Sequence, residues 1–195
     1  MANPLRKEIS KAAQALFLEE GLAGLSMRRV AERAGISAPA IYRHYKDKDE
    51  LLLEIIDAGL HILEEYLAPA LEEPTPLERL YRLADRFLDF SIEQPEHFEF
   101  AFMIRSPAIS DVSSQLVEKN WETFQHAMAQ VAACMEDGTF KRDDPIGTSL
   151  TLWAAVYGLV ALHRMHRFGP DDEMFRGLYR SSVRRLLNGM KVTPD

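Results

Sequence analysis

Basic and hydrogen-bonding side chains gather in one short stretch of the sequence, between Arg28 and Lys48. Six Lys or Arg stand there against two acids, a net charge of +4, whereas the whole 195-residue chain carries −7. A basic patch on an acidic protein is the electrostatic signature of a nucleic-acid surface. The residues that we expect to contact DNA are Arg28, Arg29, Ser37, Ala38, Pro39, Ala40, Tyr42, Arg43, His44, Lys46 and Lys48.

The residue types in this set suit two kinds of contact. Phosphate contacts fix the register of a protein on DNA without reading its sequence. The candidates for phosphate contact are Tyr42, His44, Lys46 and Lys48. The candidates for base contact are Ser37, Ala38, Ala40 and Arg43. Among these, Arg43 can bind guanine with two hydrogen bonds, and an alanine can meet a thymine methyl group. Arg28 and Arg29 can reach either a phosphate or a base.

Two short helices joined by a tight turn would position these side chains. Apolar residues recur at helical spacing over 27–34, and Gly35 follows, where a left-handed conformation costs glycine little. Ser37 is placed to cap a second helix over 38–45, whose first turn contains Pro39. This order is typical of a helix-turn-helix, whose second helix lies in the major groove. The alternative is a solvated helical hairpin with an ordinary charge cluster.

The stretch GLAGLSMRRVAERAGISAPAIYRHYKDKDEL resembles the N-terminal domain of the tetracycline-repressor (TetR) family of bacterial transcription regulators, and the resemblance covers roughly the first 55 residues. The shared residues are Gly21, Ala31, Gly35, Ser37, Ile41, Tyr42, His44, Lys48 and Leu51. Tyr45 departs from the phenylalanine that is more common in the family, and Asp47 from serine or asparagine. The resemblance implies that Tyr42 and Lys48 contact phosphates and that the residues around Pro39 choose the operator. Ile41 and Tyr45 are expected in the core.

Composition bounds the class of protein. Apolar residues make up 47% and charged residues 27% of the chain, which is ordinary for a globular protein. The single Cys134 excludes an internal disulfide and fits a reducing cytoplasm. The N-terminus shows no signal-peptide pattern, and the apolar-rich run 150–162 is shorter than a bilayer-spanning helix. We therefore expect a cytoplasmic protein that does not contact a membrane.

The apolar periodicity predicts an all-α protein of about nine helices. The expected helices cover residues 5–20, 27–34, 38–45, 48–67, 77–92, 97–104, 110–136, 145–168 and 172–188. The first has an apolar stripe of Ile9, Ala12, Ala13, Leu16 and Phe17. Start signals for three others are Ser26, the pair Thr75 and Glu78, and Asp144 before Pro145. The first three would form a helix-turn-helix DNA-binding domain over 1–50. Residues 51–195 would form a helical effector-binding and dimerisation domain, and the helix at about 48–67 connects the two. The first fifty residues carry +2 and the remainder −9, so DNA would repel the C-terminal body and attract the other end.

The C-terminal half is dense in aromatic residues and methionine. For any single one of them, core packing is the simplest interpretation, but an apolar cavity between helices is where bundles bind small molecules. Family resemblance favours the cavity, since family members commonly bind an inducer in this half. The segment from Trp153 to Gly158 also resembles the Trp-x-x-x-His-Gly (WHG) signature of one subgroup, with Tyr157 in place of the histidine. The candidate ligand contacts are Phe87, Phe90, Phe98, Phe102, Met103, Trp121, Phe124, Met128, Trp153 and Tyr157.

The last two predicted helices carry more apolar surface than one small domain needs. Packing both against a second copy would make a homodimer, whose two recognition helices meet a palindromic operator. The alternative is burial within the monomer.

Catalysis finds little support in the sequence. No phosphate-binding loop, nucleotide fingerprint or nucleophile elbow is present, and no cofactor is expected. Cys134 has no basic neighbour in sequence, so redox sensing is a remote alternative. His163 and His166 stand three apart without a clear third metal ligand, and we expect a solvent-facing pair rather than a metal site.

The sequence therefore predicts a regulator that binds double-stranded DNA, a repressor released from its operator by a small apolar effector. The alternative is a helical small-molecule-binding protein whose helix-turn-helix no longer reads DNA specifically. An enzyme is a third interpretation, against which stands only the lack of a catalytic constellation.

Overall fold

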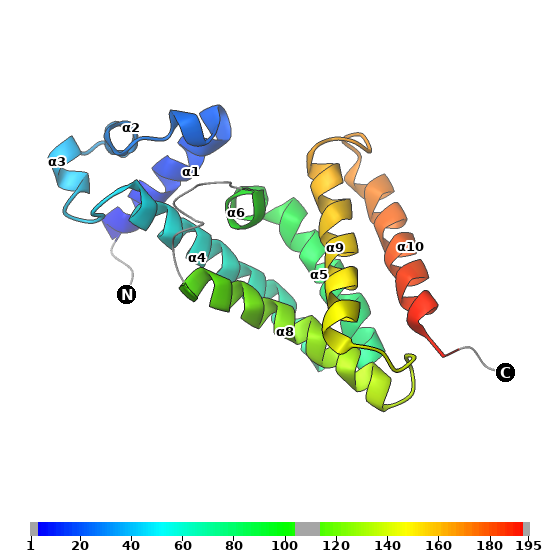
Figure 1. Cartoon of the computed structure of the whole chain (residues 1–195). Helices are drawn as coiled ribbons and strands as arrows, with labels where there is room; N and C mark the ends of the chain where they lie inside the picture. Colours follow the sequence, from blue (N-terminus) through cyan, green and yellow to red (C-terminus); the bar gives the residue numbers. More distant parts are fainter. Residues whose placement is uncertain (1–3, 104–113, 193–195) are drawn as a thin grey trace. The chain divides into compact units, whose positions relative to one another are not determined.

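The computed structural model describes residues 4–103 and 114–192, and describes side chains for residues 4–102 and 122–192. Nine α-helices lie in these ranges, together with two short helical turns, η1 (Ala68–Glu72) and η2 (Glu99–Met103) (Figure 1). The α-helices are α1 (Pro4–Gly24), α2 (Met27–Arg33), α3 (Ala38–Ile41), α4 (Lys48–Leu67), α5 (Pro76–Glu93), α6 (Pro95–Phe98), α8 (Ser114–Glu136), α9 (Pro145–Arg164) and α10 (Asp172–Met190). The described ranges contain no strand, so the all-α prediction is confirmed.

The chain divides into two compact units. Unit 1 comprises Met1–Ile62 and Gln94–Glu118, and unit 2 comprises Leu63–Glu93 and Lys119–Asp195. Both α4 and α8 run from one unit into the other, so each unit is built from two separate pieces of sequence. Each is described by itself below.

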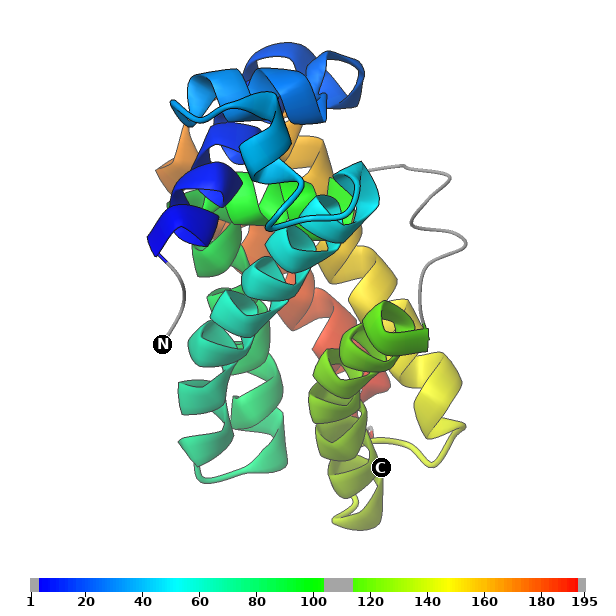
Figure 2. The same cartoon turned by 90° about the vertical axis from the view of Figure 1, so that its left-hand side faces the viewer.

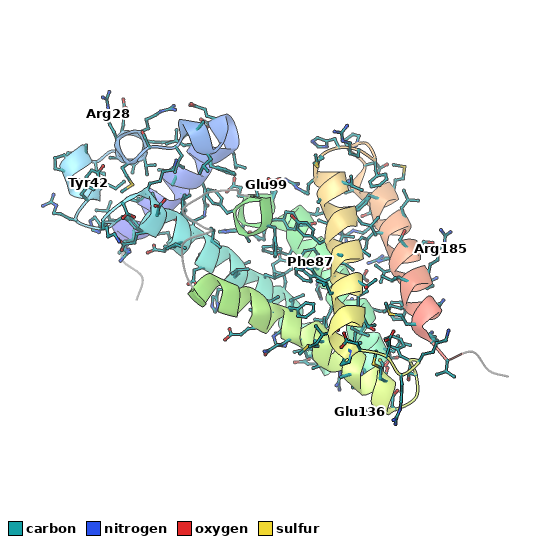
Figure 3. The ribbon with its side chains drawn as sticks, in the orientation of Figure 1. Arg28, Tyr42, Phe87, Glu99, Glu136 and Arg185 are labelled. Carbon is teal, nitrogen blue, oxygen red and sulfur yellow. The ribbon has the colours of Figure 1, made fainter. Side chains whose placement is uncertain are left out.

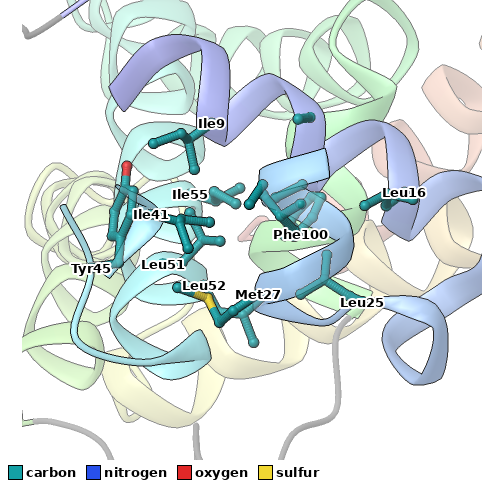
Figure 4. Close-up of a cluster of buried hydrophobic side chains, with 14 residues drawn as sticks. Ile9, Leu16, Leu25, Met27, Ile41, Tyr45, Leu51, Leu52, Ile55 and Phe100 are labelled. Atoms are coloured by element: carbon teal, nitrogen blue, oxygen red, sulfur yellow. The ribbon is translucent and has the colours of Figure 1, made fainter. Parts of the chain in front are cut away.

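The core of unit 1 joins α1 to the helix-turn-helix. Ile9, Ala13 and Leu16 follow one another at helical spacing along α1 and are buried, as the predicted stripe requires. The close-up in Figure 4 shows this apolar cluster. Its other members come from α1, α2, α3, α4, η2 and the segments between them: Ala12, Leu25, Met27, Val30, Ala31, Ile41, Tyr45, Leu51, Leu52, Ile55 and Phe100.

The turn between α2 and α3 follows the predicted signals with one exception. The Ser26 hydroxyl accepts a hydrogen bond from the Arg29 backbone N–H at 3.4 Å and caps α2. Gly35 has φ 69°, the left-handed conformation expected there. The predicted cap by the Ser37 hydroxyl is wrong, because that side chain makes no capping bond. Pro39 has no N–H, and the Ala40 N–H bonds to the Ser37 carbonyl oxygen at 2.8 Å instead.

Helix α3 is also shorter than predicted. It ends at Ile41, whereas helical spacing suggested a helix to residue 45. Tyr45 is fully buried in the core of unit 1, and Asp47 accepts a hydrogen bond from the Glu50 N–H at 2.9 Å at the start of α4. Because Tyr45 and Asp47 are both held in place, only a few residues after Ile41 are available to change the direction of the chain between α3 and α4. This segment therefore forms tight turns instead of continuing the helix.

Unit 2 packs α5 against α10, which in turn lies beside α9 (Figure 2). The Tyr179 hydroxyl of α10 donates to the Ala84 carbonyl oxygen of α5 at 2.8 Å, and Arg180 pairs with Asp85 at 3.0 Å. Thr75 and Glu78 form the predicted capping box of α5. Asp144 caps α9 ahead of Pro145, as predicted.

The expectation that His163 faces solvent is wrong. His163 is 4% exposed, its ring stacks on Phe175 with centroids 3.9 Å apart, and its Nε2 lies 2.7 Å from an Asp172 carboxylate oxygen. His166 is exposed, as expected. Burial of His163 therefore ties the end of α9 to the start of α10.

Among the described residues, only α9 is long and apolar enough to cross a membrane, judged by length and composition. The helix is longer than the apolar run over 150–162 that the sequence suggested. A helix that packs inside a protein satisfies the same two criteria, so this finding is weak evidence for a membrane span.

The buried hydroxyl of Tyr45 gives a test of the unit 1 core. It donates to Glu54 at 2.7 Å, and burial together with this carboxylate raises the pKa of Tyr45 to about 12. We expect Tyr45→Phe to lower the free energy of unfolding by about 1 kcal/mol, because Glu54 loses a hydrogen-bond donor. Urea denaturation measures this change. Tyr42→Phe is the matched control, since the Tyr42 side chain is exposed, and an equal loss in both variants would contradict the assignment.

Candidate nucleic-acid interface and apolar pocket

The predicted DNA contacts lie on α2, α3 and the segments that flank α3, except Lys48, which is the first residue of α4. Arg28, Ser37, Pro39, Tyr42, Arg43 and Lys46 are exposed. Arg29, Ala38, Ala40, His44 and Lys48 are partly buried. Figure 3 labels Arg28 on α2 and Tyr42 just after α3. The fold thus brings the set together on one motif, with more than half of its members open to a partner.

Two of the six basic residues in this stretch are already paired with acids of α1. Arg29 forms a two-pronged ion pair with Glu20 and also donates to the Gly24 carbonyl oxygen at 2.9 Å. Arg33 forms a similar pair with Glu19, both contacts at 2.6 Å. These bonds raise the pKa of each guanidinium and lower the pKa of each carboxyl group. Arg29 and Arg33 therefore fasten α2 to α1.

Arg28 and Arg43 are the two arginines of this stretch without such a partner. Within the part of the chain that the structure describes, neither guanidinium group forms a hydrogen bond or an ion pair. Both are exposed, and Tyr42 beside Arg43 is 55% exposed. Lys46 is exposed too, with its ammonium 3.5 Å from the Asp47 carboxylate. The cationic groups open to a phosphate or a base thus centre on Arg28 and Arg43.

Lys48 lies in the first turn of α4 and is half-buried. Its ammonium donates to the Leu22 carbonyl oxygen at 2.9 Å, near the kink of α1 at Gly21. Desolvation lowers the pKa of Lys48. An ammonium group has three N–H donors, so this bond leaves donors for a second acceptor.

An apolar pocket of about 40 Å³ lies within unit 2, among α4, α5, α8 and α9. Its lining consists of Leu67, Leu80, Leu83, Ala84, Phe87, Thr123, Ala127, Leu152, Trp153 and Val156. Phe87 packs against Trp153 with ring centroids 5.3 Å apart. A site for a drug-sized ligand spans about 300–1,000 Å³, so a ligand of that size would have to push the lining apart.

The predicted ligand contacts scatter between the two units. Phe87 and Trp153 line the pocket, and Phe124 packs edge-on against Trp153 at 6.5 Å. Phe90 is buried, and Met128 and Tyr157 are partly buried, none of them in the pocket lining. Phe98 and Phe102 lie in unit 1, with ring centroids 5.1 Å apart. The side chains of Met103 and Trp121 lie outside the described residues.

Sequence reasoning missed most of the pocket lining. Leu67, Leu80, Leu83, Leu152 and Val156 are ordinary aliphatic residues of the predicted helices, and nothing in their spacing sets them apart from core. Thr123 and Ala127 are four residues apart on α8, which places them on one face. Only the tertiary structure shows that these positions enclose a cavity.

One polar group borders this apolar lining. The Thr123 hydroxyl donates to a Glu64 carboxylate oxygen at 2.5 Å, and His126 Nε2 lies 3.0 Å from the other oxygen. Thr123 is 4% exposed, whereas the Glu64 side chain is 35% exposed. We call these three residues the Glu64 cluster. In the part of the chain that the structure describes, no three His, Cys, Asp or Glu residues form a group suited to a metal ion.

Comparison with known proteins decides the family. The family model described as "Bacterial regulatory proteins, tetR family" matches residues 9–55, and a second model, "Tetracyclin repressor-like, C-terminal domain", matches residues 80–186. The chain belongs to the TetR family. It is 23% identical over 191 residues to the uncharacterized HTH-type transcriptional regulator YobS of Bacillus subtilis, covering 96% of this chain and 93% of that protein. An HTH-type transcriptional regulator of Staphylococcus aureus strain USA300 is 42% identical over 57 residues, which cover 29% of this chain and 31% of that protein.

Solved TetR structures share the fold. The TetR family transcriptional regulator PfmR from Thermus thermophilus superposes with a TM-score of 0.77 at 21% identity, covering 96% of this chain and 97% of that one. The ketosteroid transcriptional regulator KstR2 of Mycobacterium tuberculosis has a TM-score of 0.74 at 21% identity, covering 99% and 98%. These structures show the fold, and the two family models make the chain a transcriptional regulator with the helix-turn-helix and C-terminal helical domain of TetR proteins.

The single cysteine of this TetR protein is poorly suited to redox chemistry. Cys134 is fully buried on α8, and burial raises the pKa of its thiol to about 11. The thiolate is the reactive form, and a raised pKa makes it scarce near neutral pH.

We expect Cys134 in the native protein to resist the thiol reagent DTNB at pH 8. With a pKa of about 11, only about one thiol in a thousand is ionised, and the side chain is closed to the reagent. After unfolding in guanidinium chloride, one thiol per chain should react at once, and absorbance at the product band measures both rates. Rapid, complete reaction of the native protein would restore redox sensing as an alternative.

Proposed function

We propose that this TetR-family regulator is a cytoplasmic repressor, which leaves its operator when a small apolar effector enters unit 2. The observation that carries the proposal is the exposed group Arg28, Tyr42 and Arg43 on the helix-turn-helix. Cations and hydroxyl donors suit phosphates, and a free guanidinium suits guanine. The intact, exposed group argues against the alternative of a binding protein that no longer reads DNA.

The DNA contacts in this proposal are those named from the sequence, and we assign their roles with their exposure and their partners in mind. Arg28, Tyr42, His44, Lys46 and Lys48 meet the backbone. Ser37, Ala38, Pro39, Ala40 and Arg43 face the bases. Arg29 chiefly holds α2 in place through Glu20, and Lys48 can hold the Leu22 carbonyl oxygen and a phosphate together.

We propose that residues 1–50 bind DNA and residues 51–195 bind effector and form the dimer, with α4 as the connection. Near its start, α4 places Leu51, Leu52 and Ile55 in the helix-turn-helix core, and at its end it places Leu67 in the pocket lining. The pocket of about 40 Å³ must widen to admit an effector. Displacement of the end of α4 then alters the helix that supports α2 and α3. Effector and operator oppose each other reciprocally in such a scheme.

Support for an apolar effector comes from the pocket lining and from relatives. Phe87 and Trp153, two of the candidate ligand contacts, line the pocket. One structural neighbour is named a ketosteroid regulator and another a putative fatty acid metabolism regulator of Clostridium perfringens. The remaining predicted ligand contacts stay candidates for a widened pocket. We also propose that the segment from Trp153 to Gly158 places this domain near the WHG subgroup, with Tyr157 instead of histidine. Nothing in this scheme calls for a catalytic residue or a cofactor.

The homodimer is proposed on the outer faces of α9 and α10. Large apolar side chains are exposed there: Ile146, Leu150, Leu162, Met165, Met174 and Leu178. Gly158 and Gly177 have open space where a Cβ would lie, which permits close approach of a second helix. A two-fold axis through this face would present two recognition helices to a palindromic operator.

Fluorescence anisotropy on DNA from immediately upstream of the gene tests the regulator function. Purified protein should bind this DNA tightly at two salt concentrations and resist scrambled competitor. Binding that competitor abolishes at both salts would overturn sequence-specific recognition at this site.

Arg43 gives a sharper test of base reading. We expect both Arg43→Ala and Arg43→Lys to lose about 1–3 kcal/mol of discrimination between operator and scrambled DNA, because alanine has no donor and lysine lacks the rigid planar fork that aligns two N–H groups with guanine. Arg43→Lys should keep the salt dependence of the parent protein. The assay is anisotropy over a salt series. Uniform weakening on both DNAs would instead make Arg43 a phosphate contact.

The proposed dimer is tested by placing a charge on its surface. Leu150 and Leu178 are 58% and 51% exposed, so Leu150→Glu with Leu178→Glu should leave the monomer folded and abolish its dimer. Light scattering after size exclusion measures the mass. Leu18→Glu is the control, because Leu18 is an exposed leucine of α1. An unchanged mass in the double variant would contradict the assignment.

A further inference from the structure

The chemistry of the effector follows from the Glu64 cluster, and this inference rests on the proposed function. Glu64 and Leu67 stand three residues apart on α4, and Leu67 lines the pocket. On α8, Thr123 lines the pocket while its hydroxyl bonds to Glu64. The carboxylate therefore lies next to the hydroxyl group of Thr123, in a pocket lining whose other residues are aliphatic or aromatic.

Among the described side chains, the Glu64 carboxylate accepts hydrogen bonds only from two residues of α8. Within the described side chains, its partners are Thr123 and His126, and no Lys or Arg pairs with it. A carboxylate only accepts hydrogen bonds, so the imidazole donates its Nε2 hydrogen. Each carboxylate oxygen thus accepts one hydrogen bond from this pair of residues, and two oxygens together can accept about four. The group can bind a further donor.

We propose that the effector is a small apolar molecule with a cationic, hydrogen-bond-donating head, such as an ammonium group, which Glu64 binds while the tail occupies the apolar pocket. An opposite charge at a partly desolvated site is attracted more strongly than in water. A carboxylate head meets repulsion from Glu64 at the same place. The cluster therefore selects amines over fatty acids with the same tail.

Burial and exposure agree with this arrangement. Glu64 is 35% exposed, so an incoming ion can reach it and shed only part of its water. Thr123 is nearly closed to solvent and belongs to the apolar lining. The two α8 residues hold the carboxylate in one orientation, which lowers the entropic cost of binding a head group. Burial of the apolar tail in the pocket adds affinity that does not depend on the charge of the head group.

Three probes with one tail and different heads test the proposal: octylammonium, octan-1-ol and octanoate. The full chain carries two tryptophans, so Trp121→Phe leaves Trp153 in the pocket lining as the reporter. Quenching of its fluorescence gives the Kd of each probe, and calorimetry on the unaltered chain checks the values. We expect octylammonium to bind about tenfold or more tightly than octanoate, with octan-1-ol between them.

Glu64→Gln should remove that preference, because the amide keeps a similar shape and can still accept from Thr123 but carries no charge. Glu65→Gln is the matched control, since the same charge is lost from the neighbouring exposed residue. Octanoate binding as tightly as octylammonium, a preference that survives Glu64→Gln, or no binding by any probe would each overturn the proposal. The comparison on the unaltered chain does not depend on how well a variant folds.

These outcomes are separate from those of the DNA assay. Specific operator binding together with a preference for octanoate would reject the ammonium effector and keep the regulator. The expected probe preference without operator binding would keep the pocket chemistry and reject the regulator. When both hold, octylammonium should also weaken operator binding in the anisotropy assay.

Discussion

The double duty of α4 is the constraint on which the proposed regulation depends. A single 20-residue helix buries Leu51, Leu52 and Ile55 in the helix-turn-helix core and ends at Leu67 in the pocket lining. A helix of 20 residues is about 30 Å long, so its two ends meet different sets of side chains. Gly59 adds a second restriction within unit 1, because a Cβ there would lie 3.2 Å from the His97 carbonyl oxygen of α6. The sequence of α4 must therefore supply apolar residues to the helix-turn-helix core and to the pocket lining, and a glycine where α6 passes close by.

Tertiary contacts reduce the positive charge that the helix-turn-helix can offer to DNA, compared with the net charge counted from its sequence. The stretch from Arg28 to Lys48 has a formal surplus of four positive charges, but Glu19 and Glu20 neutralise two of its arginines. Exposed ion pairs contribute little to stability, yet two-pronged geometry fixes orientation well. The pairs orient α2, and they concentrate the remaining positive charge around Arg28 and Arg43. Acids outside the motif thus decide which of its cations are open to DNA.

Local signals in the sequence predicted local structure well. Gly35, the Ser26 cap, the Thr75–Glu78 box and the Asp144 cap of α9 are confirmed because each depends on residues a few positions apart. The Ser37 cap failed through competition from a backbone carbonyl. The length of α3 and the burial of His163 failed through tertiary packing, which no periodicity records. The same limit applies to the pairing of Arg29 with Glu20 and to the Glu64 cluster, whose members are 59 and 62 residues apart. The roles of individual residues on DNA or effector stay predictions.

The exposed apolar face of α9 and α10 would make operator binding depend steeply on the concentration of the protein. A lone copy would leave Leu150 and Leu178 in water, and a palindrome held by one recognition helix loses half of its contacts. Below the dissociation constant of the proposed dimer, the amount of dimer grows with the square of the copy number. Halving expression would then reduce operator occupancy by more than half. The concentration of the protein would therefore regulate its target genes in addition to any effector.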